Sequence, residues 1–463
     1  MFISDRDTIA AISTAVVNSG ISIIRISGED AFPIADKVFK GKQSVMDMTS
    51  HTVNYGKFIS MDGEVIDEIL LLKLDGPKTY TRENTVEINC HGGVNVTNNV
   101  FHEIVKAGAR IAEPGEFTKR AFLNGRIDLS QAEAVMDLIN AQTDTASKIA
   151  IAHLQGKFSS AVKEVTNRIV DVSAEIEYHI EFNDDDMDGP TMGRLVASLT
   201  ECSNRLKKIL DTYDTGKIHR EGINVVIAGR PNTGKSSLMN EVLGSDRAIV
   251  TDIPGTTRDI IQDYANINGI FVNISDSAGI RETGDVIEKI GIGKSYEAAK
   301  NADLILYMLD LQSDLNSEDI KFLEMFKDKN ILIILNKTDL VSQEQTKQKV
   351  SAIRCETRHD PVTLSLKSGQ GIEGLYERFK QMLHPGQADP KNQAIVTNVR
   401  HKNSVQTAYQ AVNEAIRGFK EETPVDLITI DLNIAVHQLG LITGETASDD
   451  IIDRIFSSFC VGK

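Results

Sequence analysis

The segment Gly229–Ser236, with the sequence GRPNTGKS, fits the phosphate-binding pattern G-x-x-x-x-G-K-[ST]. An apolar run at 225–228 precedes it and predicts a buried strand, while 237–243 predicts a helix. A glycine-rich turn from strand to helix points successive backbone N–H groups at phosphate oxygens, near the positive end of the helix dipole. Lys235 would reach the β- and γ-phosphates, and the Ser236 hydroxyl would be a ligand of Mg²⁺. A plain turn can match so short a pattern, but the flanking strand and helix favour phosphate binding.

Three more segments indicate that the nucleotide is GTP. Asp276–Gly279 (DSAG) follows an apolar strand and fits D-x-x-G, in which the aspartate supports the Mg²⁺ shell and the glycine amide meets the γ-phosphate. Asn336–Asp339 (NKTD) fits N-K-x-D, and the Asp339 carboxylate can accept two hydrogen bonds from guanine that adenine does not offer. Ser365–Lys367 (SLK) resembles the S-A-K element that contacts the base. Because all three follow predicted strands in this order, we expect the chain to be a GTPase.

Hydrolysis of GTP needs a positioned water molecule and groups that neutralise transition-state charge. Gly255–Asp259 (GTTRD) fills the first switch, where Thr257 is the expected second protein ligand of Mg²⁺. Ile280 follows the D-x-x-G motif directly and has no group that orients water, so Glu282 is the nearest candidate base. The alternative for Glu282 is a surface charge on a loop.

The transition-state charge has two candidate donors. Arg281 could act as an arginine finger. A monovalent cation beside the phosphates is the alternative, and the carboxamide of Asn232 in the phosphate loop could hold it. The residues alone leave both donors open.

The composition limits the architecture and the partners. At 463 residues the chain is long enough for about three domains, and 41% hydrophobic with 25% charged residues is typical of globular proteins. No apolar run approaches the ~20 residues of a membrane span and no signal-like segment begins the chain, so we expect a cytoplasmic protein without a membrane. The net charge of −16 excludes a basic footprint over the whole chain, so RNA contact needs a local patch or a partner. Four scattered cysteines without a C-x-x-C pair argue against a metal cluster or a disulfide framework.

Residues 1–118 mix short strands and helices. The alternation around Ile24 and Ile26 predicts a strand with Arg25 on the opposite face. Arg25 and Glu87 are charges inside apolar strands, where burial without a partner is costly. They either lie on edge strands facing water or line a polar ligand pocket. The other strands expected here cover 52–59, 66–74 and 85–89, followed by a helix towards Lys106.

The rest of the chain is helical on both sides of an α/β segment. From 118 to 215 we expect helices, with Ser130 as the cap of one of them and an apolar seam from Val162 to Ile180 along another. Helices resume near 400. Between them, strands are expected at 223–228, 259–267, 270–276, 303–310, 331–336 and 361–365. This pattern predicts a multidomain α/β chain, in which a P-loop (Ras-like) nucleotide domain is inserted into an all-α domain behind an N-terminal α+β domain.

Several blocks outside the GTPase motifs resemble the MnmE (TrmE) family of GTPases, which modify the wobble uridine of tRNA. The resemblance covers nearly the whole chain. The shared blocks include Val86–Gly93 (VEINCHGG), Pro114–Arg126 (PGEFTKRAFLNGR), Gly279–Thr283 (GIRET) and Phe459–Lys463 (FCVGK). The terminal FCVGK motif is the most specific, because ordinary GTPases lack it.

The resemblance implies a domain plan and a set of ligands. Residues 1–118 would bind tetrahydrofolate and dimerise, 119–219 and 385–463 would form the helical domain, and 220–384 the G domain. Positions that match the folate contacts of the family are Arg25, Glu87, Arg126 and Lys463. Those that match its potassium ligands are Asn232, Thr251, Ile253 and Thr256, with Ser236 and Thr257 on Mg²⁺. The residues expected to contact GTP are Asn232, Thr233, Gly234, Lys235, Ser236, Ser237, Thr251, Asp252, Ile253, Pro254, Gly255, Thr256, Thr257, Asp276, Ser277, Ala278, Gly279, Asn336, Lys337, Asp339, Ser365, Leu366 and Lys367.

The resemblance also implies a reaction and partners. Potassium would stimulate hydrolysis as G domains dimerise, with Glu282 as water activator, which favours the cation over Arg281 as charge donor. An FAD-dependent MnmG-type partner would complete a heterotetramer that binds tRNA and adds an aminomethyl or carboxymethylaminomethyl group to the uridine C5. The one-carbon donor would be 5-formyl- or 5,10-methylene-tetrahydrofolate. Cys460 lies in the motif assigned to modification, although a free cysteine near a helix end can also simply pack.

This sequence departs from the family at a few places. A glycine-poor loop at Ser13–Ser19 replaces the usual proline- and glycine-rich loop, Arg126 stands where lysine is usual, and Thr81–Asn84 (TREN) differs from the common glycine-containing turn. The alternative function is a GTPase switch associated with the ribosome or its assembly, without nucleoside chemistry. A scaffold that binds GTP only structurally is a third possibility.

Overall fold

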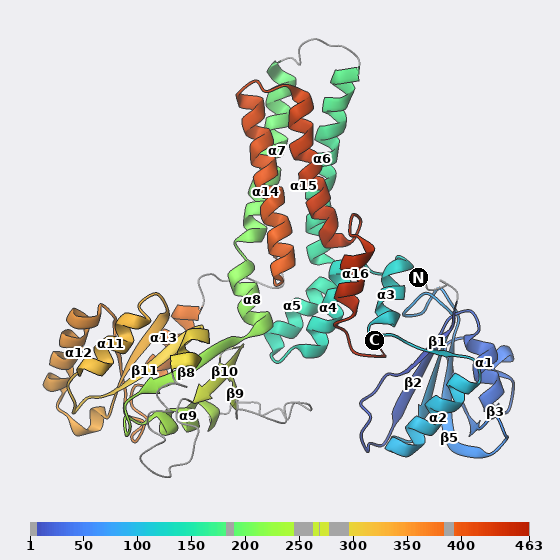
Figure 1. Cartoon of the computed structure of the whole chain (residues 1–463), viewed down its shortest axis with the longest axis horizontal. Helices are drawn as coiled ribbons and strands as arrows, with labels where there is room; N and C mark the ends of the chain where they lie inside the picture. Colours follow the sequence, from blue (N-terminus) through green and yellow to red (C-terminus); the bar gives the residue numbers. More distant parts are fainter. Residues whose placement is uncertain are drawn as a thin grey trace. The chain divides into compact units, whose positions relative to one another are not determined.

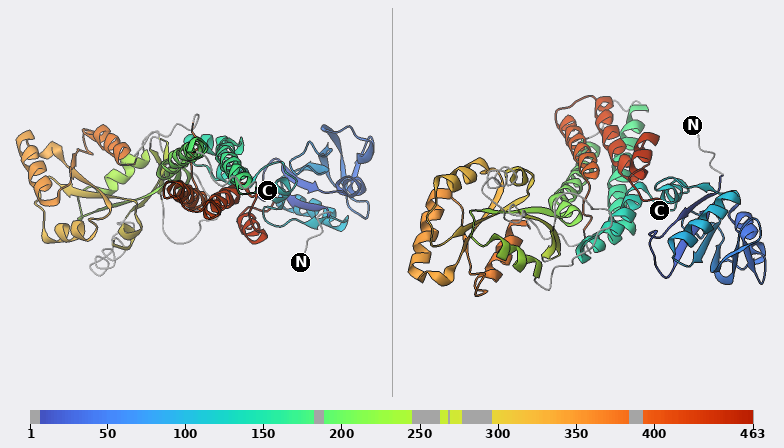
Figure 2. Two further views of the ribbon diagram at one scale, coloured as in Figure 1. Left: turned by 90° about the horizontal axis from the view of Figure 1, so that it is seen from above. Right: turned by 60° about the horizontal axis from the view of Figure 1, so that its bottom comes forward.

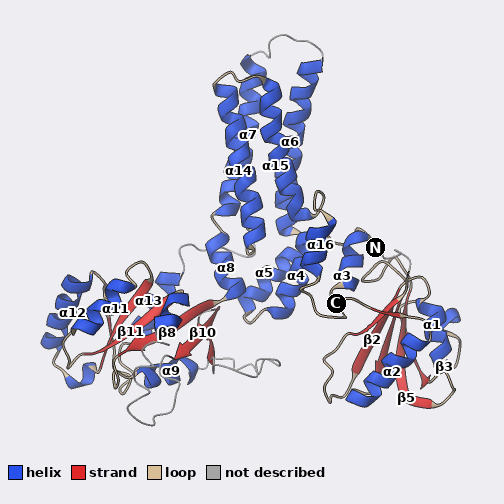
Figure 3. Cartoon of the chain, in the orientation of Figure 1, coloured by secondary structure: helices blue, strands red, loops and turns tan. Residues whose placement is uncertain are grey.

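The computed structural model describes residues 7–181, 189–244, 263–267, 269–276, 296–383 and 393–462. The chain divides into two compact units. The first comprises Met1–Met136, His153–Thr200 and Gln410–Lys463, and the second Asp137–Ala152 and Glu201–Tyr409. Each unit contains one sheet (Figure 3), which confirms the predicted multidomain combination of sheets and helices.

The sheet of the first unit has seven strands in the order β3-β4-β5-β6-β2-β1-β7. All neighbours are antiparallel except the parallel pair β1 and β7. The strands are β1 (Ile9–Ile12), β2 (Ser22–Ser27), β3 (Phe39–Gly41), β4 (Thr52–Ile59), β5 (Val65–Leu74), β6 (Thr85–Cys90) and β7 (Arg110–Ile111). The predicted strands at 52–59, 66–74 and 85–89 are therefore confirmed to within one residue.

Two helices, α1 (Ala31–Val38) and α2 (Val94–Lys106), lie along one face of this sheet (Figures 1 and 2). They share a buried core with Ile24 and Ile26 of β2. Because side chains alternate along a strand, Arg25 lies on the opposite face. The predicted alternation is confirmed, and it reserves that face for the charged residue.

Other helices of the first unit are α3 (Glu116–Leu123), α6 (Lys157–Glu181), α15 (Val425–Thr443) and α16 (Asp449–Phe456). The predicted seam of α6 is buried from Val162 to Ile176, while Ile180 at its end is exposed. Helix α15 packs against α6. Four further helices contain residues of both units: α4 (Leu129–Asn140), α5 (Asp144–Leu154), α7 (Gly189–Leu210) and α14 (Val399–Lys420).

By length and composition alone, helix α15 is long and apolar enough to cross a membrane. Its most apolar stretch has a mean hydropathy of 1.4, and 33% of that stretch is buried. This differs from the sequence-based expectation, which considered uninterrupted apolar runs and so passed over a helix that contains Asp431. It is weak evidence for a membrane span, because the core helices of soluble proteins pass the same test.

The predicted cap of α4 was wrong by two residues. Ser130 lies inside the helix, and its hydroxyl donates to Asp128 Oδ1 at 2.7 Å. That carboxylate oxygen also accepts the backbone N–H of Gln131 at 3.0 Å, while Gln131 Oε1 accepts the backbone N–H of Asp128. This reciprocal pair is a capping box built on Asp128.

The sheet of the second unit has six strands in the order β13-β12-β11-β8-β10-β9, and only β9 is antiparallel to its neighbour. The strands are β8 (Ile223–Gly229), β9 (Asp263–Ile267), β10 (Ile270–Asp276), β11 (Leu304–Asp310), β12 (Asn330–Asn336) and β13 (Val362–Thr363). Of the predicted strand at 259–267, residues 259–262 lie outside the described residues. The strand predicted at 361–365 is shorter, because Ser365 turns back to pair with Gln370.

Helices cover both faces of this second sheet, as a parallel sheet requires. One face buries α9 (Lys235–Gly244) and α13 (Ile372–Leu383), and the other α11 (Ser317–Met325) and α12 (Gln343–Thr357). Helix α8 (Tyr213–Glu221) of the same unit leads into β8 (Figure 1). The parallel strands thus bring the ends of β8, β11 and β12 to one edge of the sheet, where the predicted motifs lie.

Candidate functional site

The phosphate loop connects β8 to α9 in a conformation that requires glycine at two positions. Gly229 has a φ of +139°, and a β-carbon there would lie 2.3 Å from the carbonyl oxygen of Met308. Gly234 has a φ of +104°, and its β-carbon would lie 2.4 Å from Asn336 Nδ2. Any side chain would therefore push the loop away from β11 and β12. The spacing of the two glycines is explained by these two close approaches.

The backbone of the loop surrounds the Lys235 ammonium and binds it. The Lys235 ammonium donates to the carbonyl oxygens of Gly229 and Arg230, both at 2.9 Å. Thr233 Oγ1 donates to the same Arg230 carbonyl at 2.8 Å. Asn232 has a φ of +63°, in the left-handed region. A left-handed residue next to a right-handed one turns consecutive backbone N–H groups towards one point. With Lys235 and the N-terminus of α9, this geometry suits an anion.

Asn336 joins the phosphate loop to the two base-recognition segments. Its Nδ2 donates to the carbonyl oxygen of Thr233 at 2.9 Å, while its Oδ1 accepts the backbone N–H groups of Lys337 at 2.8 Å and Leu366 at 3.2 Å. The side chain is buried, with 4% exposed. Three sequence motifs that are far apart in the chain are therefore fixed to one another through a single carboxamide.

The Asp339 carboxylate is oriented by the S-L-K segment. Ser365 Oγ donates to Asp339 Oδ1 at 2.6 Å and accepts the backbone N–H of Ser368. The hydroxyl thus orients the carboxylate, and the remaining lone pairs of its two oxygens stay available to a ligand. This arrangement suits recognition of a base that presents two N–H donors side by side, as guanine does.

Sequence analysis missed Asp310 in this region. It ends β11 directly opposite Asn336 in the parallel ladder, and Lys337 Nζ binds its Oδ2 at 2.6 Å. Burial raises the pKa of Asp310, but the hydrogen bonds from Lys337 and the backbone of Gln312 outweigh it and lower the pKa below its ordinary value. The signal was present in the sequence, because an acidic residue ends an otherwise apolar strand. Asp310 holds the Lys337 side chain across the end of the sheet.

Replacement of Asn336 with alanine is expected to weaken GTP binding about 10- to 100-fold. The change leaves the Thr233 carbonyl and two backbone N–H groups without their partner, at roughly 1–3 kcal/mol for a buried unsatisfied group. Fluorescent-nucleotide titration measures the effect. Asn330→Ala at the exposed start of the same strand is the matched control and should bind GTP as the parent does. Equal affinities for the two variants would contradict the bridging role.

Several predicted site residues lie outside the described residues. These are the first-switch positions Thr251–Thr257, the Ser277–Gly279 segment, Glu282 and Lys463. The backbone of Asp276 is described, and it ends β10 beside Ile227 of β8. Ser236 is exposed in the first turn of α9, where its hydroxyl fits an oxygen ligand of Mg²⁺. The roles of the outlying residues stay predictions.

Arg25 and Glu87 face each other across the neighbouring interior strands β2 and β6. The Arg25 guanidinium contacts Glu87 Oε1 at 2.8 Å through Nη2 and 2.9 Å through Nε. Their side chains are 17% and 21% exposed. The alternative that they are edge positions facing water is wrong, because neither strand is an edge strand and each charge compensates the other.

Tyr80 gathers the predicted folate residues of the first unit. The guanidinium of Arg25 lies 5.6 Å from the centre of the Tyr80 ring and that of Arg126 lies 4.7 Å from it. Arg126 Nη1 also donates to the Tyr80 carbonyl oxygen at 3.0 Å, and the Tyr80 hydroxyl bonds Thr118. Sequence analysis missed Tyr80, because it lies in an irregular stretch between β5 and β6 and matches no motif. The result is an aromatic ring close to both Arg126 and the Arg25–Glu87 ion pair.

The C-terminal segment packs on the end of β1. Gly115 N–H donates to the carbonyl oxygen of Cys460 at 3.3 Å, and Ser13 Oγ donates to that of Gly462 at 3.3 Å. Gly462 has a φ of +93°, and a β-carbon there would lie 2.5 Å from the Ile12 carbonyl. The Cys460 residue itself is exposed. The C-terminal segment thus places the accessible Cys460 thiol beside β1, which pairs with β2, the strand that carries Arg25.

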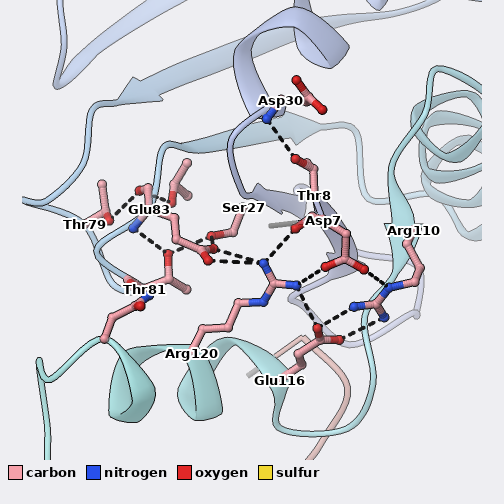
Figure 4. A network of polar contacts seen from close by, with 12 residues as sticks. Asp7, Thr8, Ser27, Asp30, Thr79, Thr81, Glu83, Arg110, Glu116 and Arg120 are labelled. Atoms are coloured by element: carbon pink, nitrogen blue, oxygen red, sulfur yellow. Dashed lines mark hydrogen bonds and ion pairs between the residues drawn. The ribbon is translucent and has the colours of Figure 1, made fainter. Parts of the chain in front are cut away.

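A buried ion network supports this region (Figure 4). Arg120, which is 8% exposed, donates to Asp7, Glu83 and Glu116, and Arg110 binds Asp7 and Glu116 from the other side. Burial raises the pKa of Asp7 and of Glu116, but the hydrogen bonds from the two arginines outweigh it and lower both. The network joins the start of β1, the β5–β6 connection and α3. These ion pairs therefore hold together the segments that carry Tyr80 and that contact the C-terminal segment.

Comparisons with known proteins agree with this arrangement. Residues 8–126 match the family model described as "GTP-binding protein TrmE N-terminus", and residues 129–460 match "MnmE helical domain". Proteins named "tRNA modification GTPase MnmE" are similar over their full length: that of Acetivibrio thermocellus is 46% identical over 99% of both chains, and that of Alkaliphilus metalliredigens 45% over 99% of both. The protein of that name from Clostridioides difficile is 43% identical over 100% of both chains.

A solved structure of Aquifex aeolicus Era bound to GDP·AlF₄⁻ also matches. It is 24% identical, covers 41% of this chain and 66% of that one, and has a TM-score of 0.29, so the family assignment does not depend on it. The assignment depends on the full-length relatives, both family models and the G-x-x-x-x-G-K-S, N-K-x-D and S-L-K segments that Asn336 joins. The chain is a GTPase that belongs to the MnmE family of tRNA modification GTPases.

Proposed function

We propose that GTP hydrolysis by this chain drives modification at C5 of the wobble uridine of tRNA, together with an FAD-dependent partner of the MnmG type. The observation that carries the proposal is the docking of the C-terminal segment, which holds the exposed Cys460 beside β1 through Gly115 and Ser13. A GTPase switch associated with the ribosome has no need for a thiol held in this way. The chain would work in the cytoplasm as a homodimer that forms a heterotetramer with its partner, and the partner would supply much of the tRNA surface that a net charge of −16 does not offer.

Nucleoside analysis of tRNA from a deletion strain tests this function. Loss of the aminomethyl or carboxymethylaminomethyl group at the wobble uridine, restored by the intact gene, is the expected result. A strain with unchanged wobble uridines and a defect in ribosome assembly would instead support the alternative GTPase switch. Absence of GTP turnover under every cation would support the scaffold that uses GTP only structurally.

The residues around Tyr80 fit a one-carbon-substituted tetrahydrofolate, in the 5-formyl or 5,10-methylene form. The Tyr80 ring offers an aromatic surface, the paired Arg25 and Glu87 offer N–H donors and a carboxylate for the polar edge of the folate ring, and Arg126 offers a cation for the carboxylate end. Lys463, by resemblance to the family, would complete this set. When bound, the folate supplies the one-carbon unit. The protein's own contribution is to hold the ring beside the C-terminal segment that carries Cys460.

GTP turnover is expected to be much faster in K⁺ than in Na⁺ at equal ionic strength. The Asn232 carboxamide in the phosphate loop is an oxygen ligand beside the expected phosphates, and Thr251, Ile253 and Thr256 would complete the site as two G domains meet. A cation there would neutralise charge that develops during hydrolysis. Phosphate release in KCl and NaCl measures it, with Asn232→Ala as the variant that should lose the difference. Equal rates in both salts for the parent chain would exclude the cation mechanism.

Replacement of Glu282 with alanine is expected to lower turnover by at least about 100-fold and to leave the affinity for GTP unchanged. A positioned general base contributes about 10²–10⁴-fold to the rate. Single-turnover hydrolysis and nucleotide titration separate the two effects. Arg281→Ala is the neighbouring control, and it should retain most activity if the cation supplies the charge. Full turnover in Glu282→Ala would show that another group activates the water.

A further inference from the structure

A basic groove lies next to the folate residues of the first unit. It has a volume of about 680 Å³, within the range of small-molecule sites, which is about 300–1,000 Å³. Three permanent cations, Lys78, Arg82 and Arg126, line it together with His51 and Tyr80. No aspartate or glutamate is among its lining residues. In a chain with 66 acidic and 50 basic residues, such a one-sided lining is unusual.

These cations are not used in ion pairs within the described part of the chain. Arg82 Nη1 donates to the carbonyl oxygens of Asn124 at 3.0 Å and Gly125 at 3.3 Å. Arg126 Nη1 donates to the Tyr80 carbonyl. Both guanidiniums are thus positioned by neutral groups and keep their full charge for a ligand. Lys78 is exposed on the same wall.

Arg82 has a backbone conformation that favours glycine. Its φ of +63° lies in the left-handed region, where a side chain is disfavoured. The turn nevertheless carries an arginine, and its two bonds to the 124–125 loop hold the guanidinium at the groove. Residues in a disfavoured backbone conformation are kept where the surrounding structure enforces it, and they are concentrated at ligand sites.

We propose that the basic groove, lined by Lys78, Arg82, Arg126 and His51, binds the γ-linked oligoglutamate chain of a tetrahydrofolate. This inference rests on the proposed folate site, with which the groove shares Arg126 and Tyr80. A folate whose glutamate carboxylate pairs with Arg126 would place each further glutamate, with one more carboxylate, along the other cations of the groove. Arginine forks fit carboxylates in pairs, and a carbon chain with regular carboxylates matches a row of separate cations.

Calorimetric titration of the full-length chain with the mono- and triglutamate forms of 5-formyl-tetrahydrofolate tests the proposal. The parent chain should bind the triglutamate about tenfold more tightly, because two added carboxylates each gain an exposed ion pair worth a few-fold. Added salt should reduce this preference. Lys78→Gln, and Lys78→Gln combined with Arg82→Gln, should abolish most of the preference and leave monoglutamate affinity unchanged. Lys57→Gln, an exposed lysine of β4 outside the groove, is the matched control and should keep the preference.

The remaining outcomes are distinct. Equal affinity of the parent for both forms overturns the oligoglutamate groove and leaves the folate site intact. Failure of the parent to bind either form overturns the folate site itself and the groove with it. A Lys78→Gln variant that keeps the triglutamate preference but loses affinity for tRNA assigns the groove to RNA phosphates and overturns the proposal. Unchanged monoglutamate affinity in the variants shows that they are folded.

Discussion

Asp339→Asn is expected to lower the affinity for GTP roughly 100-fold or more and to create affinity for xanthosine triphosphate. The carboxylate is expected to accept hydrogen bonds from two guanine donors, and hydrogen bonds to a charged group contribute roughly 1.5–3 kcal/mol each. An asparagine amide offers one acceptor and one donor, so its N–H₂ opposes the amine of guanine. Xanthine carries a carbonyl at that position, which the new amide can bind. Competition titrations with the two nucleotides measure the change.

Ser365→Ala separates recognition from orientation in this test. Ser365 Oγ donates to Asp339 Oδ1 at 2.6 Å and does not depend on which base is bound. Its loss should weaken GTP binding only a few-fold and should not admit xanthosine triphosphate, because the carboxylate remains. If Asp339→Asn reduced both nucleotides equally, or if Ser365→Ala gained xanthosine triphosphate, Asp339 would not be the group that selects guanine.

The nucleotide motifs could be predicted from the sequence because each is local. A buried parallel strand followed within a few residues by glycine or a polar side chain gives both the element and its functional end. The strands from β8 to β12 therefore follow the predicted ranges closely over the described residues. Asp276, Asn336 and Ser365 are each found at or just after the end of a strand, as expected. Neighbouring parallel strands then bring these ends together without any long-range information.

Contacts between distant residues could not be predicted in this way. The Asn336–Thr233 bond spans 103 residues, and the Arg120–Asp7 bonds span 113. Nothing in the local sequence around Tyr80 shows that it would lie between Arg25 and Arg126. The sequence leaves open whether Arg25 faces water or a pocket for the same reason, because the answer depends on which strands flank β2. Strand register and sheet order determine these long-range contacts, and hydrophobic periodicity alone does not predict them.

The sequence block around Arg120 illustrates the difference. Pro114–Arg126 supported the family resemblance, but its sequence did not reveal a structural role for Arg120. In the structure this side chain donates to Asp7 Oδ1 at 2.7 Å, to Glu116 Oε1 at 2.9 Å and to Glu83 Oε1 at 3.2 Å (Figure 4). Arg110 compensates Asp7 and Glu116 as well, but removal of the buried Arg120 guanidinium would take one cation from both and the Arg120 ion pair from Glu83.

Arg120→Met is therefore expected to destabilise the first unit by about 3–5 kcal/mol, the cost of removing one partner from a buried ion pair. Hydrogen exchange followed by mass spectrometry on peptides from β2 and α3 should show opening increased by roughly 100-fold or more. Arg168→Met removes a partly exposed arginine near the exposed Glu164 in α6 and should cost at most about 1 kcal/mol. Similar exchange in both variants would show that the buried network adds no more than a surface pair.

The pH dependence of stability identifies the mechanism. Asp7 and Glu116 have pKa values lowered by the arginines from ordinary values of 3.8 and 4.5, so the unfolded chain binds protons at a higher pH than the folded chain. Their stabilisation is fully present above those ordinary values and is lost as the pH falls through the lowered ones. In urea titrations between pH 7 and pH 3, the parent should lose stability in the acid range more steeply than Arg120→Met, in which the two pKa values return towards the ordinary range. Parallel curves would mean that Arg120 does not hold these carboxylates in their charged form. The loss of stability in Arg120→Met would then come from the changed packing of the side chain.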